Sequence, residues 1–193
     1  MKLGIFGGSF NPPHNGHLIV AQSVQDQLKL DKIVFVPCAS PPHKLNARLA
    51  PADSRLAMTA MAVQGNGRFE ASDAEVRRGG VSYTVDTLKY FLEIYSRAEL
   101  FLIIGIDNYL EFHTWRSPEE IMDLAELVVM NREGYTNDLP SRAATKRVRF
   151  VDVPSIGISG TMIRLHVRTG RQIRYLVPAD VENYIKNYHL YKD

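Results

Sequence analysis

The stretch that decides the fold is the first glycine-rich segment of the chain, which reads LGIFGGSFNPPHNGH at residues 3–17. Its apolar run Leu3–Phe6 is closed by two glycines, which is typical of a short buried strand that ends in a turn. From His17 to Leu28 apolar residues recur at steps of three and four, as on one face of a helix. Residues 7–16 are therefore predicted to connect the end of a strand to the start of a helix.

Strands and helices alternate along the rest of the chain. Strands are predicted at 33–36, 69–71, 100–104, 127–130 and 148–151. Helices are predicted at 51–63, at 159–167 with Ser159 as the cap, and from a cap at Ser82 or Thr84 to Tyr95. Two further helices are predicted to begin at Ser117 and at Pro178. Residues 133–146 are predicted to form an exposed loop. This order predicts an α/β fold: a Rossmann-like, doubly wound and mostly parallel sheet with helices on both faces, in a single domain 1–193.

Composition excludes several classes of protein. Of the 193 residues, 45% are hydrophobic and 23% are charged, which is ordinary for a folded globular chain. The single cysteine, Cys38, excludes an internal disulfide and a thiolate cluster for zinc or iron–sulfur. No apolar run reaches the length of a secretory signal or of a membrane-spanning helix. We therefore expect a cytoplasmic protein without a membrane partner.

The charge of the chain is unevenly distributed. Residues 1–140 carry 13 Lys and Arg against 17 Asp and Glu, whereas residues 141–193 carry 10 against 4. The basic C-terminal part either faces an anionic partner or is a solvated surface.

The loops after Phe6, Val36, Ile104 and Val151 are where we expect the chemistry, because parallel sheets bind ligands beyond the carboxyl ends of their strands. In the first of these loops, the glycines let the backbone approach a phosphate closely, and the start of the following helix offers unpaired N–H groups that can bind it. The loop has neither the Gly-Lys-Ser/Thr ending of a Walker loop nor a G-x-G-x-x-G pattern, which argues against hydride transfer with a bound nicotinamide cofactor.

Two histidines end this loop. His14 and His17 are three residues apart, so both imidazoles can meet one ligand on one helical face. A metal site is not expected, because no nearby thiol or carboxylate completes a zinc set. Alternatively the two histidines have no ligand, and one is packed in the protein while the other is exposed. The glycine turn beside them favours ligand binding over this alternative.

A second anion site is predicted where Ser159-Gly160-Thr161 opens a helix that carries Arg164. Lys44 could add a third cation, or it is simply solvated. Trp115, the only tryptophan, could stack on a flat substrate ring or fill the core. Two anion sites at one edge of a sheet would suit a nucleoside triphosphate.

Residues 8–17 contain the G-x-F-x-x-x-H-x-G-H signature of the nucleotidyltransferase superfamily. Together with five other segments, the chain resembles the bacterial nicotinate-nucleotide adenylyltransferase family over nearly its whole length. These segments are 41–44 (PPHK), 82–88 (SYTVDTL), 104–107 (IGID) with Trp115, 158–164 (ISGTMIR) and 173–178 (IRYLVP). The resemblance implies that nicotinate mononucleotide attacks the α-phosphorus of ATP to give deamido-NAD and pyrophosphate, with Mg²⁺ bound with the ATP.

The resemblance also implies roles for individual residues. His14, His17 and Arg164 would be the catalytic residues, with His17 at the α-phosphate. ATP would contact Gly7, Gly8, Ser9, Phe10, Gly105, Asp107, Ile158, Ser159 and Thr161. The mononucleotide would contact Lys44, Tyr83, Thr84 and Trp115.

One departure from the family pattern is Gly160, which stands where a second serine is more usual and predicts weaker ATP binding. Alternative functions are pantetheine-phosphate adenylyltransferase or another nucleotidyltransferase such as a cytidylyltransferase. A nucleic-acid-binding module that uses the C-terminal arginines is a further alternative, but it leaves both histidines and Trp115 unexplained. We expect no nucleic acid partner. A homo-oligomer is possible, and only the resemblance favours the acid over the amide mononucleotide.

Overall fold

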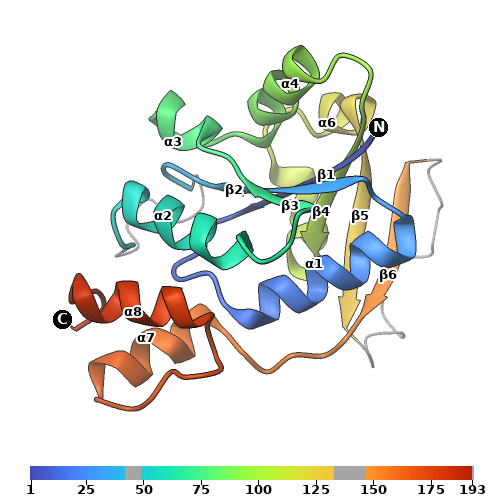
Figure 1. Ribbon diagram of the computed structural model, residues 1–193. Coiled ribbons are helices and arrows are strands. Elements are labelled where there is room, and N and C mark those ends of the chain that lie inside the picture. The colour runs from blue at the N-terminus through green and yellow to red at the C-terminus, as the bar shows by residue number, and fades with distance from the viewer. Residues whose placement is uncertain (42–48, 133–146, 193) are drawn as a thin grey trace.

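A six-stranded parallel sheet forms the centre of the computed structural model, which describes residues 1–41, 49–132 and 147–192 (Figure 1). The strands are β1 (Lys2–Gly8), β2 (Lys32–Pro37), β3 (Phe69–Ala71), β4 (Glu99–Gly105), β5 (Ala125–Arg132) and β6 (Val148–Val153). Their spatial order is β3-β2-β1-β4-β5-β6, and every neighbouring pair is parallel. The predicted fold class and all six predicted strands are confirmed.

Among the described residues, helices lie between the successive strands from β1 to β5, and two more follow β6. The longer helices are α1 (Asn15–Leu28), α2 (Ala52–Val63), α4 (Thr84–Ile94), α7 (Gly160–Arg168) and α8 (Ala179–Asn187). Shorter helices are α3 (Ala74–Arg78), α5 (Ile106–Leu110), the 3-10 turn η2 (Phe112–Thr114) and α6 (Pro118–Leu124). The sequence analysis did not predict α3, α5 or η2, which are too short to show a helical period. The loop predicted at 133–146 lies outside the described residues.

One predicted helix cap is wrong, and a second lacks its side-chain hydrogen bond. Tyr83, rather than Ser82 or Thr84, is the N-cap of α4, and Ser82 instead accepts a hydrogen bond from the Ala39 backbone N–H at 2.9 Å. Ser117 is the N-cap of α6 and Pro118 occupies the first turn, both as predicted, but Ser117 has a left-handed φ of 53° and its side chain forms no capping hydrogen bond. At Ser82 a tertiary contact overrides the local capping preference.

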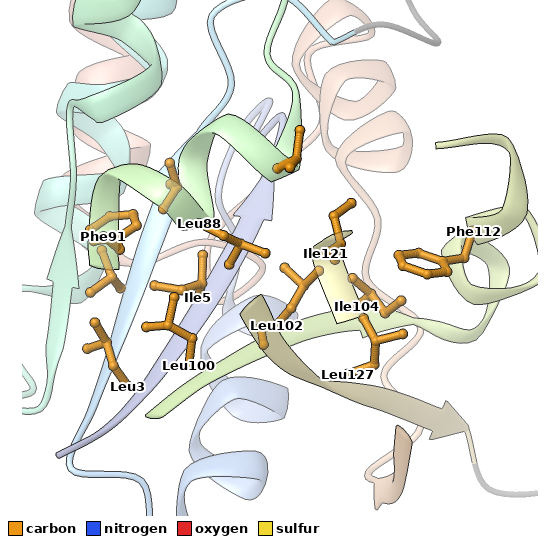
Figure 2. Close-up of a cluster of buried hydrophobic side chains, with 14 of the residues drawn as sticks. Leu3, Ile5, Leu88, Phe91, Leu100, Leu102, Ile104, Phe112, Ile121 and Leu127 are labelled. Carbon is orange, nitrogen blue, oxygen red and sulfur yellow. The ribbon is translucent and has the colours of Figure 1, made fainter. Parts of the chain in front are cut away.

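The two faces of the sheet are buried by different helices, because successive side chains of a strand point to opposite faces. On one face Leu3 and Ile5 belong to a cluster with residues of α4 and α6. Figure 2 shows this cluster, with Leu88 of α4 close to the strand residues. On the other face Phe6 packs with α1 through Ala21. Burial on both faces explains why central strands such as β2 and β4 read as continuous apolar runs.

A third cluster attaches the C-terminal helices to the rest of the molecule. It joins Met58 of α2 to Ile163 of α7 and Val181 of α8, all fully buried. In Figure 1, α8 lies between α2 and α7, so the end of the chain is near the helix that follows β2. This packing fixes the basic C-terminal part of the chain beside the glycine-rich loop.

The strand order reverses between β1 and β4. Chain connections run outward from β1 through β2 to β3, and from β4 through β5 to β6. Loops on either side of such a reversal diverge and leave a crevice beyond the carboxyl ends of the strands. The loop after Gly8 and the start of α5 after Gly105 border that crevice.

Candidate active site

The loop that follows β1 is held in an unusual backbone conformation. Phe10 has a φ of 42°, in the left-handed region that aromatic residues rarely adopt. Its ring is only 2% exposed and packs edge-on against Phe6 and His17, with centroid separations of 5.7 and 5.1 Å. Packing of the ring therefore stabilises a strained backbone, and the same ring holds the imidazole of His17 in place.

The two histidines lie against each other at the start of α1. His14 is the N-cap of the helix and His17 lies in its first turn, so only His17 is on the helical face that the spacing predicted for both. Their rings are nevertheless stacked, with centroids 3.6 Å apart and an interplanar angle of 24°. The backbone N–H of His14 donates to Nδ1 of His17 at 3.1 Å. Nδ1 of His17 is therefore an acceptor, and the proton of the neutral ring is on Nε2.

Both imidazoles are neutral at pH 7. Burial lowers the pKa of His14 from 6.5 to about 4. Burial lowers the pKa of His17 further, to about 3, and the neighbouring His14 adds to that shift. The Nδ1 atom of His14 is buried without a hydrogen-bond partner among the described residues. The pair consequently offers hydrogen-bond donors and one unsatisfied ring nitrogen, but no positive charge.

Arg164 of α7 links the second predicted anion site to this loop. Its Nη1 donates to the backbone carbonyl of Asn11 at 2.7 Å, and its Nη2 donates to Oγ1 of Thr161 at 3.1 Å. Ser159 caps the same helix by accepting the Met162 N–H at 3.2 Å. The guanidinium therefore has a fixed orientation, and the first turn of α7 faces the loop that carries the histidines.

Gly160 allows this close approach. A Cβ atom built on Gly160 would lie 3.0 Å from the Asn11 carbonyl oxygen and 3.2 Å from Nη1 of Arg164. A side chain here requires the carbonyl or the guanidinium to move. The glycine that departs from the family pattern thus has a packing role in this chain.

Three cavities meet at the glycine-rich loop, and we name each after a neighbouring element. The α7 cavity has a volume of about 890 Å³ and brings together the following predicted residues: Ser9, Phe10, His14, His17, Thr161 and Arg164. The β4 cavity has a volume of about 280 Å³ and is lined by both histidines, Gly105, Asp107, Ile158 and Ser159, among others. The two histidines therefore separate two cavities, and they lie on the same cavity as Arg164.

The α4 cavity, of about 400 Å³, lies on the other side of the loop. Gly7, Gly8, Ser9, Tyr83, Thr84 and Trp115 line it among other residues. Trp115 is half-buried and its ring lies 5.4 Å from that of Phe112, so it both supports the core and faces the cavity. The Arg116 guanidinium carbon lies over the Tyr83 ring, 4.6 Å from the ring centroid, and this pair closes one side of the α4 cavity. Thr84 begins α4, whose first backbone N–H groups have no intrahelical partner.

Two features of the candidate site have no recognisable signal in the sequence. Arg55 of α2 is 1% exposed, and its guanidinium donates to backbone carbonyls of Ser9, Cys38, Ala39 and Ala50 at 2.6–3.0 Å. Glu75 is buried behind the α4 cavity and accepts from Oγ1 of Thr87 at 2.5 Å, and burial raises its pKa. An arginine and a glutamate in helical segments look like surface residues until the fold is known.

Other predictions concern the periphery of the site. Lys44 lies outside the described residues. No three His, Cys, Asp or Glu side chains in residues 1–41, 49–132 and 147–192 gather into a group that could hold a metal ion. None of the described helices is both long and apolar enough to cross a bilayer. Cys38 is buried and its thiol pKa is raised by burial, which makes it a poor nucleophile.

The chain is similar to known proteins in sequence and in fold. The cytidylyltransferase-like family matches residues 5–166. A "probable nicotinate-nucleotide adenylyltransferase" of Salinibacter ruber is 43% identical over 192 residues, covering 100% of this chain and 98% of the relative. A protein of the same name from Thermus thermophilus is 44% identical and covers both chains completely. In fold, the chain is similar to the Plasmodium falciparum nicotinic acid mononucleotide adenylyltransferase complexed with NaAD, with a TM-score of 0.78, 19% identity, and 98% and 97% coverage.

Proposed function

The chain belongs to the nicotinate-nucleotide adenylyltransferases, within the cytidylyltransferase-like family, and on that premise we propose how its site transfers the adenylyl group of ATP to nicotinate mononucleotide. The products are deamido-NAD and pyrophosphate. The observation that carries the assignment of roles is the meeting of three cavities at residues 7–17. One cavity accommodates each of the three parts of the reacting complex: adenosine, polyphosphate and acceptor mononucleotide.

The nucleophile in this proposal is the phosphate of the mononucleotide. Its second pKa is about 6, so the dianion predominates at neutral pH and no protein base is needed. A phosphate oxygen forms a bond to the α-phosphorus of ATP while the bond from that phosphorus to the bridging oxygen of the β-phosphate breaks. Pyrophosphate leaves with the electron pair of that bond. The buried thiol of Cys38 supports direct transfer without a covalent intermediate.

His17 acts as a neutral hydrogen-bond donor. Because the His14 backbone N–H occupies Nδ1, the Nε2–H is the donor available to the α-phosphoryl group. A donor held in position before the reaction stabilises the charge that develops on the transferring group without reorganisation. The ring of Phe10 and the stacked ring of His14 keep that donor in place.

The β- and γ-phosphates bind at the start of α7. Ser159, Thr161 and Arg164 lie there, where backbone N–H groups and a guanidinium favour an anion. Positioning of this kind is the main source of catalysis when the protein supplies no covalent chemistry.

The remaining two cavities hold the nucleosides. Gly105, Asp107 and Ile158 line the adenosine side in the β4 cavity. In the α4 cavity Trp115 stacks on the nicotinate ring, and a backbone N–H near Thr84 meets its carboxylate. Tyr83, held by Arg116, forms the adjoining wall.

Mg²⁺ enters this scheme with ATP. Among the described residues the α7 cavity offers imidazoles, hydroxyls and a guanidinium, not a group of carboxylates, so phosphate oxygens would supply the ligands that this ion prefers. When bound, the ion neutralises charge on the polyphosphate. A cytoplasmic location, a homo-oligomeric state and the absence of a nucleic acid partner stay predictions.

Pyrophosphate release tests the proposed function. Purified protein with ATP and Mg²⁺ is given nicotinate mononucleotide, its amide analogue or phosphopantetheine in parallel reactions. We expect the acid mononucleotide to give the fastest release, with deamido-NAD as the organic product. Release of pyrophosphate only with phosphopantetheine would instead identify the pantetheine-phosphate enzyme, and no release with any of the three would refute the proposal.

A further inference from the structure

The last residues of the chain fold back onto the glycine-rich loop. Helix α8 ends at Asn187, and the following tail, residues 188–192, turns sharply so that the Leu190 N–H donates to the Ile185 carbonyl at 3.1 Å. His189 and Tyr191 both have left-handed backbones, with φ values of 52° and 65°. Non-glycine residues in this region cost stability, so the contacts of the tail must compensate for the strain.

Tyr191 makes the contact that reaches the site. Its ring packs against the third core cluster, which joins α2, α7 and α8. Its hydroxyl donates to Oδ1 of Asn11 at 2.9 Å, across 180 residues of sequence. Burial raises the pKa of the phenol, so the hydroxyl keeps its proton and stays a donor throughout the physiological range.

Asn11 is the residue on which three distant segments meet. Its Oδ1 accepts from the Ala50 N–H at 3.0 Å as well as from Tyr191, and its backbone carbonyl accepts from Nη1 of Arg164. Asn11 is 4% exposed, so water does not replace a lost partner freely. The tail thus shares in holding the Asn11 side chain, and the backbone carbonyl of the same residue shares in holding Arg164.

We propose that Tyr191 is a positioning residue for ATP: through Asn11 it sets the geometry of the Arg164 guanidinium that holds the polyphosphate. The proposal rests on the function proposed above. Tyr191 and His189 line the same α7 cavity as Arg164, so the tail also forms the outer wall of the polyphosphate site. A displacement of about 1 Å at such a group is enough to weaken binding and alignment measurably.

Tyr191→Phe tests this inference, because it removes the hydroxyl and leaves the ring in the core. We expect the KM for ATP to rise about fivefold, because Asn11 without this partner no longer fixes the Arg164 guanidinium, while the KM for the mononucleotide stays within twofold. Tyr188→Phe is the matched control: it removes a hydroxyl from the same tail, and this side chain is 63% exposed and stacks on Tyr184. Tyr188→Phe should leave both KM values unchanged.

A merely structural role for Tyr191 gives a different result. Partial unfolding lowers the amount of active enzyme, so the apparent kcat falls and both KM values stay constant. That result, or an unchanged KM for ATP, would overturn the proposal. The double variant Asn11→Ala with Tyr191→Phe should bind ATP no more weakly than Asn11→Ala alone, because the two residues act through one contact.

Direct ATP binding, measured by calorimetry without the second substrate, separates this inference from the proposed function. If wild-type protein binds ATP but makes no dinucleotide, the proposed function fails. The weaker ATP binding expected for Tyr191→Phe is then still measured in the same titration. Equal affinities of wild type and Tyr191→Phe would refute the positioning role whatever the reaction.

Discussion

The backbone N–H of His14 donates to Nδ1 of His17, three residues along the chain and 3.1 Å away. This single contact determines the tautomer of His17, because an accepting Nδ1 leaves the proton on Nε2. It also requires His14 to be the N-cap, where the backbone N–H has no helical partner of its own. The geometry of a helix start thus supplies a neutral donor at a fixed place.

Replacement of His17 by alanine should lower kcat far more than it raises the KM for ATP. The donor is proposed to strengthen its contact as charge develops on the α-phosphoryl group, and interactions made only in the transition state appear in kcat. Loss of one such donor costs roughly 100- to 1,000-fold in kcat. Initial rates of pyrophosphate release over a range of ATP concentrations measure both constants.

His166→Ala is the matched control for that experiment, since the His166 ring bonds to the Gln172 carbonyl on the far side of α7 and lines none of the three cavities. We expect its kcat to stay within twofold of wild type. A change confined to KM in His17→Ala would show that His17 binds the ground state, contrary to the proposed role.

Stability should depend on pH through the same two histidines. Their folded-state pKa values of about 4 and about 3 lie below the unfolded value of 6.5, so at pH 5 the unfolded chain binds protons that the folded chain does not. The free energy of unfolding therefore falls as the pH is lowered from about 6.5 toward 4, by up to about 1.4 kcal/mol per pH unit for each histidine. Urea unfolding at pH 7 and pH 5 measures this loss.

His14→Gln should reduce the difference in unfolding free energy between pH 7 and pH 5, because glutamine does not titrate. His113→Gln, at an exposed position in η2, provides the matched control and should keep the full difference. If His14→Gln and wild type lose equal stability between these pH values, then His14 is not the buried neutral group described above.

The sequence predicts the sheet well because its signals are strong and local. Continuous apolar runs such as Leu100–Ile104 can be satisfied only by burial on both faces. The glycines after Phe6 indicate where β1 ends, although the strand includes both of them. The same local reasoning predicts the starts of α1 and α7, where the two anion sites are proposed, because capping and glycine residues are readable as a pattern. The structure places His14, His17 and Arg164 on the α7 cavity, as two anion sites at one edge of the sheet require.

Contacts over long distances in sequence could not be predicted. Tyr191 and Asn11 are ordinary residues in their own segments, and only the packing of α8 beside α2 and α7 brings them together. Arg55 likewise occupies a buried position in a helix that reads as amphipathic, and its acceptors are backbone carbonyls, which leave no trace in the sequence. Side-chain identity reports local preference, whereas these contacts are consequences of topology.

Trp115→Ala should raise the KM for nicotinate mononucleotide by about tenfold and leave the KM for ATP unchanged. Removal of the indole takes away the stacking surface in the α4 cavity, while the proposed polyphosphate residues Ser159, Thr161 and Arg164 line the other two cavities. Trp115→Phe keeps a smaller ring, so its KM for nicotinate mononucleotide should lie between those of wild type and Trp115→Ala. A lower melting temperature with unchanged KM values in both variants would assign Trp115 to the core alone.

Arg55→Met should lower the free energy of unfolding by at least about 3 kcal/mol, because it removes a buried cation from four backbone carbonyls at once. Those carbonyls belong to the loops after β1 and β2 and to the segment before α2, so the α4 cavity and the α7 cavity lose their shared support. Arg97→Met, the same substitution at an exposed arginine, should change stability by no more than about 0.5 kcal/mol. Urea titration of both variants at pH 7 measures the difference, and a similar small loss in each would mean that the four carbonyls find other donors when Arg55 is absent.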